Sequence, residues 1–142
     1  MGAGWKVIPH TADVALRAWG DTMEEMFVAA VTGMFSQAWD RRTVIPRSVW
    51  EVSASGRDAA SLLVNLLNEF LYRHECERVL WRGVESITFV AEEQDWRVLA
   101  RVRGETITHR HRLRRELKAA TLHGLEVKPT RNGFSVQVIF DV

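Results

Sequence analysis

The chain has 142 residues, of which 46% are hydrophobic and 26% are charged, as in an ordinary globular protein with a hydrophobic core. Nineteen lysines and arginines against eighteen acidic residues leave a formal net charge of +1. So small a charge argues against a protein that mainly coats nucleic acid, but it leaves room for a local basic patch. The single cysteine, Cys76, excludes an internal disulfide and a cysteine-based zinc site.

The sequence shows no sign of a membrane segment or of a second domain. No apolar run approaches the roughly 20 residues of a membrane span, and no targeting peptide precedes the first strand. We therefore expect one domain, residues 1–142, in the cytoplasm and without a membrane partner. The six tryptophans are scattered along the chain. That distribution is typical of core anchors and sheet-face residues rather than of a platform for stacking bases.

The first half of the chain alternates between strand and helix patterns. Residues 14–20 alternate apolar and polar side chains, which predicts a half-buried strand. Residues 23–35 place apolar side chains at helical spacing, and Thr22 with Glu25 matches a capping box. A second strand is predicted at 48–56. The clearest helix of the chain follows within 56–75, where Asp58 is placed to cap it.

The second half is richer in strands. Residues 85–104 predict an antiparallel hairpin that turns around 93–95. Residues 109–123 fit neither the helical nor the strand periodicity, so their secondary structure stays open. The segment 125–142 predicts a short strand and a long strand joined by Asn132–Gly133, whose positive backbone angles suit a tight hairpin. Together these elements predict an α+β fold. We expect a two-layer sandwich in which a mostly antiparallel sheet of about six strands packs against two or three helices.

Polar residues at strand ends are the candidates for chemistry, because the usual phosphate loops, nucleophile elbows and zinc motifs are absent. His10 and Asp13 stand before the first predicted strand, although both are poor strand formers. They either belong to a turn that precedes the strand or form a metal site. Asp141 and the terminal carboxylate of Val142 close the last strand, and hard cations prefer such oxygen ligands. If they complete the site, the last strand must pair near the first.

The segment 109–118, "HRHRLRRELK", is strongly basic. It predicts either a contact surface for phosphate or an acidic partner, or a solvated surface without a partner. Two histidines among arginines would make a poor metal site, because nearby positive charge disfavours a cation.

Several blocks of the sequence, in their order along the chain, resemble the archease family. They are "HTADVALRAWGDTMEEMFVAAVTGMF", "DAASLLVNLLNEFLY", Gly104–Glu105, "LKAATLHGLEV" and the closing "FDV". The resemblance implies a two-layer α+β fold. It also implies a protein cofactor, not an enzyme, for the RtcB-type RNA ligase, which joins RNA ends in tRNA splicing and RNA repair with GTP and divalent metal. Such a cofactor promotes guanylylation and multiple turnover of the ligase, and it meets tRNA only through the ligase.

The resemblance also implies the roles of particular residues. The family's metal ligands fall on Asp13, Asp141 and Val142, and its functionally important lysine falls on Lys118. His10 and His123 are placed at most at the rim of this metal site, not among its ligands. Leu122 stands at a position where the family frequently has a tyrosine. Oxygen ligands on flexible chain ends favour Ca²⁺, with Mg²⁺ or Mn²⁺ as alternatives.

Two other functions stay open from the residues alone. One is a small metal-dependent hydrolase that uses Asp13, Asp141 and His10, although no general base is recognisable. The other is a general RNA-binding or chaperone-like module, against which the nearly neutral charge and the lack of an aromatic platform both count.

Overall fold

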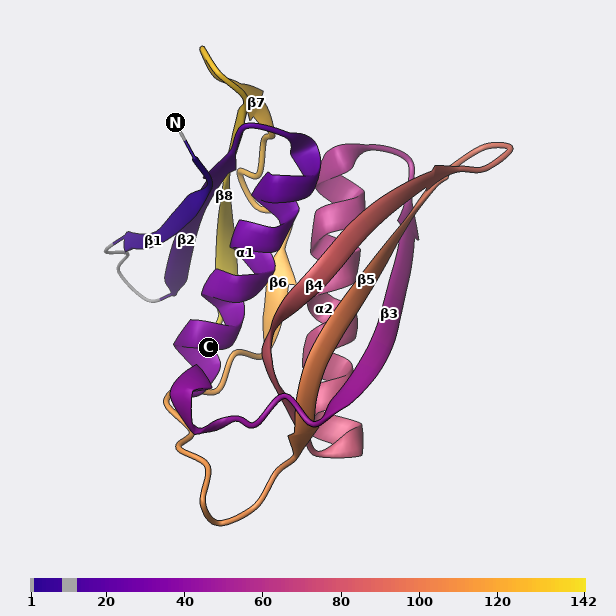
Figure 1. Cartoon of the computed structure of the whole chain (residues 1–142). Helices are drawn as coiled ribbons and strands as arrows, with labels where there is room; N and C mark the ends of the chain where they lie inside the picture. The colour runs from indigo at the N-terminus through magenta and orange to yellow at the C-terminus, as the bar shows by residue number, and fades with distance from the viewer. Residues whose placement is uncertain (1, 9–12) are drawn as a thin grey trace.

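The computed structural model describes residues 2–8 and 13–142. In this part of the chain two helices and eight strands form an α+β fold, which confirms the predicted class (Figure 1). The helices are α1 (Met23–Ala38) and α2 (Ala59–Glu77), with a short 3₁₀ turn η1 (Arg41–Thr43). The strands are β1 (Gly4–Ile8), β2 (Val14–Gly20), β3 (Ser48–Gly56), β4 (Val79–Ala91), β5 (Trp96–Thr106), β6 (Ala119–Thr121), β7 (Lys128–Pro129) and β8 (Phe134–Asp141).

The strands form two antiparallel sheets rather than one. The larger sheet has the order β1-β2-β8-β6, with β7 also paired to β8, and the smaller has the order β3-β5-β4. Sequence patterns predicted about six strands and missed β1 and β6. A strand of three residues, such as β6, is too short to show a periodicity of its own. Within the described residues, neither helix is long and apolar enough to cross a membrane.

Each helix packs against both sheets, so a single core joins all the layers. Helix α1 contacts β2 of the larger sheet and β4 of the smaller one, while α2 contacts β6 and β3 (Figure 1). Phe35 of α1 lies at the centre of this core. Its ring centroid is 5.1 Å from Trp39, 5.2 Å from Phe70 and 5.5 Å from Trp81. Trp39 and Trp81 are buried, as expected for anchoring tryptophans.

Both predicted helix caps are present. The Glu25 backbone N–H donates to Thr22 Oγ1 at 3.1 Å, and the Glu25 carboxylate accepts from the Asp21 N–H at 3.1 Å. At the second helix, Asp58 accepts from the Ser61 N–H at 2.8 Å. These bonds pair amide groups that the first turn of a helix leaves without partners.

The predicted C-terminal hairpin forms, but the prediction that Asn132 and Gly133 have positive backbone angles at its turn was wrong. Neither Asn132 nor Gly133 has a positive φ. Pro129 pairs with Phe134, and the Thr130 N–H donates to the Gly133 carbonyl at 2.7 Å. The two residues at the tip of the turn are therefore Arg131 and Asn132, one position earlier than expected. A Cβ at Gly133 would lie 2.0 Å from the Gly20 carbonyl oxygen. Glycine is required there because the turn packs directly against the end of β2, not because of its backbone angles.

Strand β6 is held from both sides. On one side it pairs with β8, where Ala119 lies opposite Asp141. On the other side Asn68 of α2 takes the place of a neighbouring strand. Its Nδ2 donates to the Ala120 carbonyl at 3.0 Å, and its Oδ1 accepts from the Ala120 N–H at 2.7 Å. One amide side chain thus pairs both backbone polar groups of a buried residue.

We predict that Asn68→Ala lowers the free energy of unfolding by about 2 kcal/mol, because it leaves two buried backbone groups unpaired. Urea denaturation measures the loss, and amide hydrogen exchange at Ala120 should accelerate. Asn65→Ala is the matched control, since Asn65 makes one exposed bond to the Ser55 carbonyl. Equal losses in the two variants, with unchanged exchange at Ala120, would contradict the prediction.

Candidate functional site

The start of β2 and the end of β8 meet at one end of the larger sheet. Val14 pairs with Phe140 in the antiparallel register, so Asp13 stands just before this pair and Asp141 just after it. The pairing of the first predicted strand with the last one is thereby confirmed. Because the two strands run antiparallel, the residues that flank a shared pair belong to the same end of the sheet. Two acidic residues 128 positions apart in the sequence therefore lie at one tip.

Lys118 reaches the same tip from the neighbouring strand. Its backbone N–H donates to the Asp141 carbonyl at 2.8 Å, just before β6 begins. This bond fixes the backbone from which the lysine side chain projects, and that side chain is exposed. We call Asp13, Lys118, Asp141 and Val142 the acidic tip. Three separate segments of the chain contribute to it.

The acidic tip is open to solvent. Asp13 is half-buried, Asp141 is exposed, and Val142 retains 45% of its accessible surface. Within the described residues, no three His, Cys, Asp or Glu side chains come together in a way that could hold a metal ion. A cation bound here would therefore use the two carboxylates together with backbone oxygens, water or groups from a partner. The oxygen-only donor set fits Ca²⁺ or Mg²⁺ and is a poor fit for zinc.

The structure tests the predicted rim position for only one of the two histidines, His10 and His123. His10 lies outside the described residues. His123 follows β6, whose Ala119 faces Asp141 and whose Thr121 faces Ile139. The strand therefore leads the chain away from the acidic tip before it reaches His123. The exposed His123 donates its backbone N–H to Thr121 Oγ1 at 3.3 Å. The structure does not bring it to the tip.

The first two thirds of the stretch 109–123, whose structure sequence patterns left open, belong to a loop of residues 107–118 with a single isolated bridge between Leu113 and Trp39. Its path is fixed by bonds to the end of α1. The N–H groups of Arg114 and Arg115 both donate to the Ala38 carbonyl, at 2.9 and 3.3 Å. The loop runs from the end of β5 directly to Lys118, so its anchoring also positions one member of the acidic tip.

Glu105 is the main anchor of this loop, although no sequence pattern indicated a role for it. The residue keeps only 6% of its accessible surface. Its carboxylate accepts four bonds: from the Ile45 N–H at 2.7 Å, Arg47 Nε at 2.9 Å, Arg110 at 2.8 Å and His111 Nε2 at 2.8 Å. Burial by itself raises the pKa of Glu105, but these bonds outweigh it and hold the pKa well below the usual range.

His111 is a buried partner of this carboxylate rather than a surface residue. The Thr108 backbone N–H donates to its Nδ1 at 2.9 Å, so Nδ1 is an acceptor. The ring proton is therefore on Nε2, which donates to Glu105. In the sequence, the only feature that pointed to Glu105 was the Gly104–Glu105 block.

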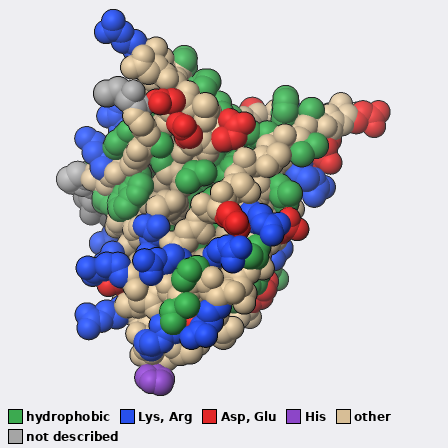
Figure 2. Space-filling view, in the orientation of Figure 1, with side chains coloured by type: hydrophobic (Ala, Val, Ile, Leu, Met, Phe, Trp, Pro, Cys, Tyr) green, Lys and Arg blue, Asp and Glu red, His purple; other side chains and the backbone are tan. Residues whose placement is uncertain are grey.

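Arginines gather around the loop and η1. Figure 2 shows lysine and arginine side chains clustered over the lower part of the molecule, where Figure 1 places this loop. We call this the basic loop surface; it comprises Arg41, Arg42, Arg82, Arg110 and Arg114.

The charges of the basic loop surface are only partly balanced. A hydrogen bond from Arg42 lowers the pKa of Asp40 to about 2, and Arg114 adds a second positive charge 3.7 Å from that carboxylate. Arg41 instead lies beside another cation. Burial and the nearby Arg82 both lower the pKa of Arg41. A surface of this kind attracts phosphate groups or acidic side chains.

Comparisons with known proteins converge on one family. The model of the Archease protein family (MTH1598/TM1083) matches residues 5–142. Protein archease of Methanopyrus kandleri is 33% identical over 139 residues, which cover 97% of this chain and 99% of that protein.

Solved structures agree with these sequence matches. The solution structure of Methanobacterium thermoautotrophicum protein 1598 is 26% identical, with a TM-score of 0.84 and coverage of 98% of this chain and 99% of the other. The crystal structure of an archease, possible chaperone, from Thermotoga maritima has a TM-score of 0.57, with 96% of each chain covered. At 18% identity, this last similarity bears on the fold alone.

We predict that Glu105→Gln lowers the free energy of unfolding at pH 7 by about 2 kcal/mol, because the charge that three side-chain donors share is lost. The pKa of Glu105 in the folded state lies below the roughly 4.3 of an unfolded glutamate. Its stabilisation is therefore complete above that value and is lost as the pH falls toward the folded pKa. Thermal melts from pH 7 to pH 2 should show a shallower acid loss in the variant.

Glu93→Gln is the control for this experiment, since Glu93 is exposed in the β4–β5 turn. It should change neither the stability at pH 7 nor the acid profile. Parallel acid profiles for the parent and Glu105→Gln would show that the buried carboxylate contributes nothing to acid sensitivity.

Proposed function

The chain belongs to the archease family, and from this premise we propose that it activates an RtcB-type RNA ligase in tRNA splicing and RNA repair. It promotes metal-dependent guanylylation and multiple turnover of the ligase as a non-catalytic protein cofactor in the cytoplasm. The ligase is its direct partner at the acidic tip, and that interaction links it to tRNA.

One observation carries this proposal: Asp13, Lys118 and Asp141 meet at an exposed end of the sheet. Because Asp141 is exposed and Asp13 is only half-buried, groups from a second protein can reach this end of the sheet. A site built for catalysis within this chain would instead be expected to lie in a concave, enclosed pocket. The exposed tip is suited to completing or modifying the active site of a partner.

The acidic tip provides the ligands for a divalent cation. Asp13 and Asp141 would hold it through carboxylate oxygens, and Val142 would contribute backbone oxygen. Exposed ligands at the ends of two strands favour Ca²⁺, which tolerates irregular geometry, over Mg²⁺ or Mn²⁺. A cation bound here supplies positive charge that can offset the negative charge of phosphate groups.

Lys118 adds a positive charge that does not depend on metal. An ammonium group is a compact, strongly hydrated charge that can contact a phosphate or an acidic side chain of the ligase. The basic loop surface precedes it in the chain and extends the positive potential away from the tip. Together they support docking of a phosphate-bearing or acidic surface beside the two carboxylates.

We predict that Asp13→Ala and Asp141→Ala each abolish ligase activation while the melting temperature changes little, because neither residue belongs to the apolar core. The assay combines the host ligase, GTP and a broken tRNA, and it measures joining and guanylylation of the ligase. Titration calorimetry with Ca²⁺ and Mg²⁺ measures binding to each variant, with Glu93→Ala as the control.

The central proposal fails if joining and guanylylation are the same with and without this protein. The metal-site part fails if the variants bind cations as the parent does, or lose activity only by unfolding. Nucleotide or phosphoester turnover by the protein alone would favour the hydrolase alternative.

We predict that Lys118→Ala leaves the fold intact and reduces ligase activation about tenfold or more, as expected for one hydrogen bond from a charged donor. Lys118→Arg should retain part of the activation because it keeps the charge. Lys128→Ala is the matched control, since Lys128 is exposed on β7 outside the acidic tip. Full activation by the Lys118→Ala protein would contradict this prediction and would mean that Lys118 is an ordinary surface lysine.

A further inference from the structure

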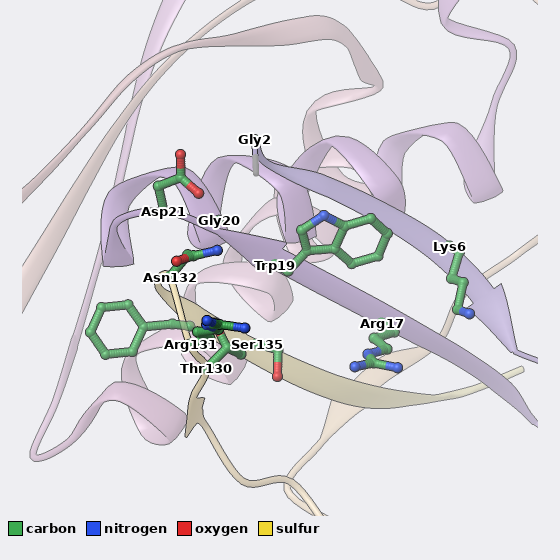
Figure 3. A pocket seen from close by; sticks show the side chains of 11 residues that line it. Gly2, Lys6, Arg17, Trp19, Gly20, Asp21, Thr130, Arg131, Asn132 and Ser135 are labelled. Carbon is green, nitrogen blue, oxygen red and sulfur yellow. The ribbon is translucent and has the colours of Figure 1, made fainter.

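A second candidate site extends from the middle of β2 to the end of that strand away from the acidic tip. There the outer face of the larger sheet and the β7–β8 turn line a half-open pocket of about 350 Å³ (Figure 3). The lining residues that matter for its chemistry are Lys6, Arg17, Trp19, Asp21, Arg131 and Asn132. None of them was singled out as a site residue from the sequence.

Strand alternation explains why three of these side chains share a face. In β2, Leu16 and Ala18 are fully buried toward the helices, whereas Arg17 and Trp19 project from the other side of the sheet. The register then sets Lys6 of β1 directly opposite Arg17. Two basic side chains therefore stand side by side across two strands, next to an indole.

This arrangement of charge costs stability in the absence of a ligand. Like charges directly opposite each other on neighbouring strands repel. Among the described residues, no ion pair with a carboxylate is found for Lys6, Arg17 or Arg131. Asp21 is the one acidic residue among the described residues that line the pocket. The pocket thus carries a net positive charge that an anion would balance.

Trp19 differs from the buried tryptophans Trp39 and Trp81. It is only partly buried, and its ring lies across β1 at Gly4, where a Cβ would fall 2.6 Å from Trp19 Cζ2. Glycine at this position therefore lets the indole lie close to the sheet beside the cations. Trp19 is thus a sheet-face tryptophan, the second of the two roles expected for these residues, and not a core anchor.

The β7–β8 turn forms the remaining wall. Figure 3 shows Lys6 and Arg17 on one side of the Trp19 indole, and Arg131 with Asn132 on the other. The turn is held against β2 by the close approach of Gly133 to the Gly20 carbonyl. Arg131 and Asn132 are therefore presented from a fixed backbone rather than from a chain end.

We propose that this pocket binds a nucleoside phosphate unit, with the base on the Trp19 indole and the phosphate between Lys6 and Arg17. Stacking on an aromatic ring beside cations is how proteins hold single nucleotides without selecting their sequence. Inorganic phosphate or an acidic side chain would leave the indole unused, and an apolar ligand would leave the cations unbalanced. Only a ligand with both an aromatic and an anionic part uses the whole site.

The unit can be a free nucleotide or one nucleotide of a single-stranded RNA, because the contacting chemistry is the same. The proposal does not rest on ligase activation. The pocket begins at Arg17 in the middle of β2 and extends away from the acidic tip, and it can be tested with the protein alone.

The experiment follows the indole N–H resonances of the full ¹⁵N-labelled chain by NMR at low salt. The titrants are AMP, adenosine, ribose 5-phosphate, inorganic phosphate and an acidic peptide of glutamates. We expect AMP to shift the Trp19 resonance and to bind at least tenfold more tightly than each of the other titrants. Trp19→Leu and Arg17→Gln should each weaken AMP binding at least tenfold.

Matched controls separate the pocket from general effects of charge and aromaticity. Trp96→Leu removes a tryptophan that is 46% exposed on β5, and Arg115→Gln removes an exposed arginine of the 107–118 loop. Both should bind AMP as the parent does. If Trp19→Leu proves unstable, Arg17→Gln still tests the site, because its side chain is exposed.

A comparison of UMP with the tetranucleotide of uridine identifies the source of the nucleotide. Tighter binding of the tetranucleotide, with loss of that advantage in Arg131→Gln, assigns the site to single-stranded RNA. Equal affinities assign it to free nucleotides. An unmoved Trp19 resonance, phosphate binding as tight as that of AMP, or tighter binding of the acidic peptide would overturn the proposal.

Discussion

The pairing of β2 with β8 is the constraint on which the rest of this structure depends. It joins one of the first segments of the chain to the last, in the middle of the larger sheet, over the register from Val14–Phe140 to Gly20–Phe134. The inner face of this pair, which includes Leu16, Val138 and Phe140, is fully buried in the common core. Because a one-residue slip would turn these side chains to the outer face, burial fixes the register. The same register sets Asp13 beside Asp141.

Two polar side chains, Asn68 and Glu105, act as anchors that hold in place segments that have little apolar surface of their own. Asn68 substitutes for a strand along β6, and Glu105 gathers donors from the residues before β3 and from the 107–118 loop. Neither anchor touches the acidic tip. Each restricts the path of the backbone that delivers Lys118 to Asp141. In a small domain, buried and fully satisfied polar groups of this kind can order an irregular segment that hydrophobic packing leaves free.

The two ends of β2 differ in their chemistry. At the start of the strand, carboxylates from two segments form an oxygen-rich, exposed tip that is suited to a hard cation and a protein partner. From its middle to its end, the outer face carries an indole and unbalanced basic groups that are suited to a nucleoside phosphate. A small domain of the archease family thus has room for two separate binding surfaces that share one strand. A ligand bound at one need not block the other.

Local patterns in the sequence by themselves determined the two helices, their caps Thr22 and Asp58, the strand alternation and hence the α+β class. These follow from neighbours within a few residues, which is the range over which periodicity and capping act. The order of blocks along the chain indicated the family and, through it, Asp13, Lys118 and Asp141. Only the tertiary structure decided that the strands divide into two sheets, that Gly133 packs on Gly20, that Glu105 and His111 are buried together, and that Lys6, Arg17 and Trp19 share a pocket. Each of these depends on contacts between segments far apart in the chain, and the register and burial that create them are properties of the whole fold.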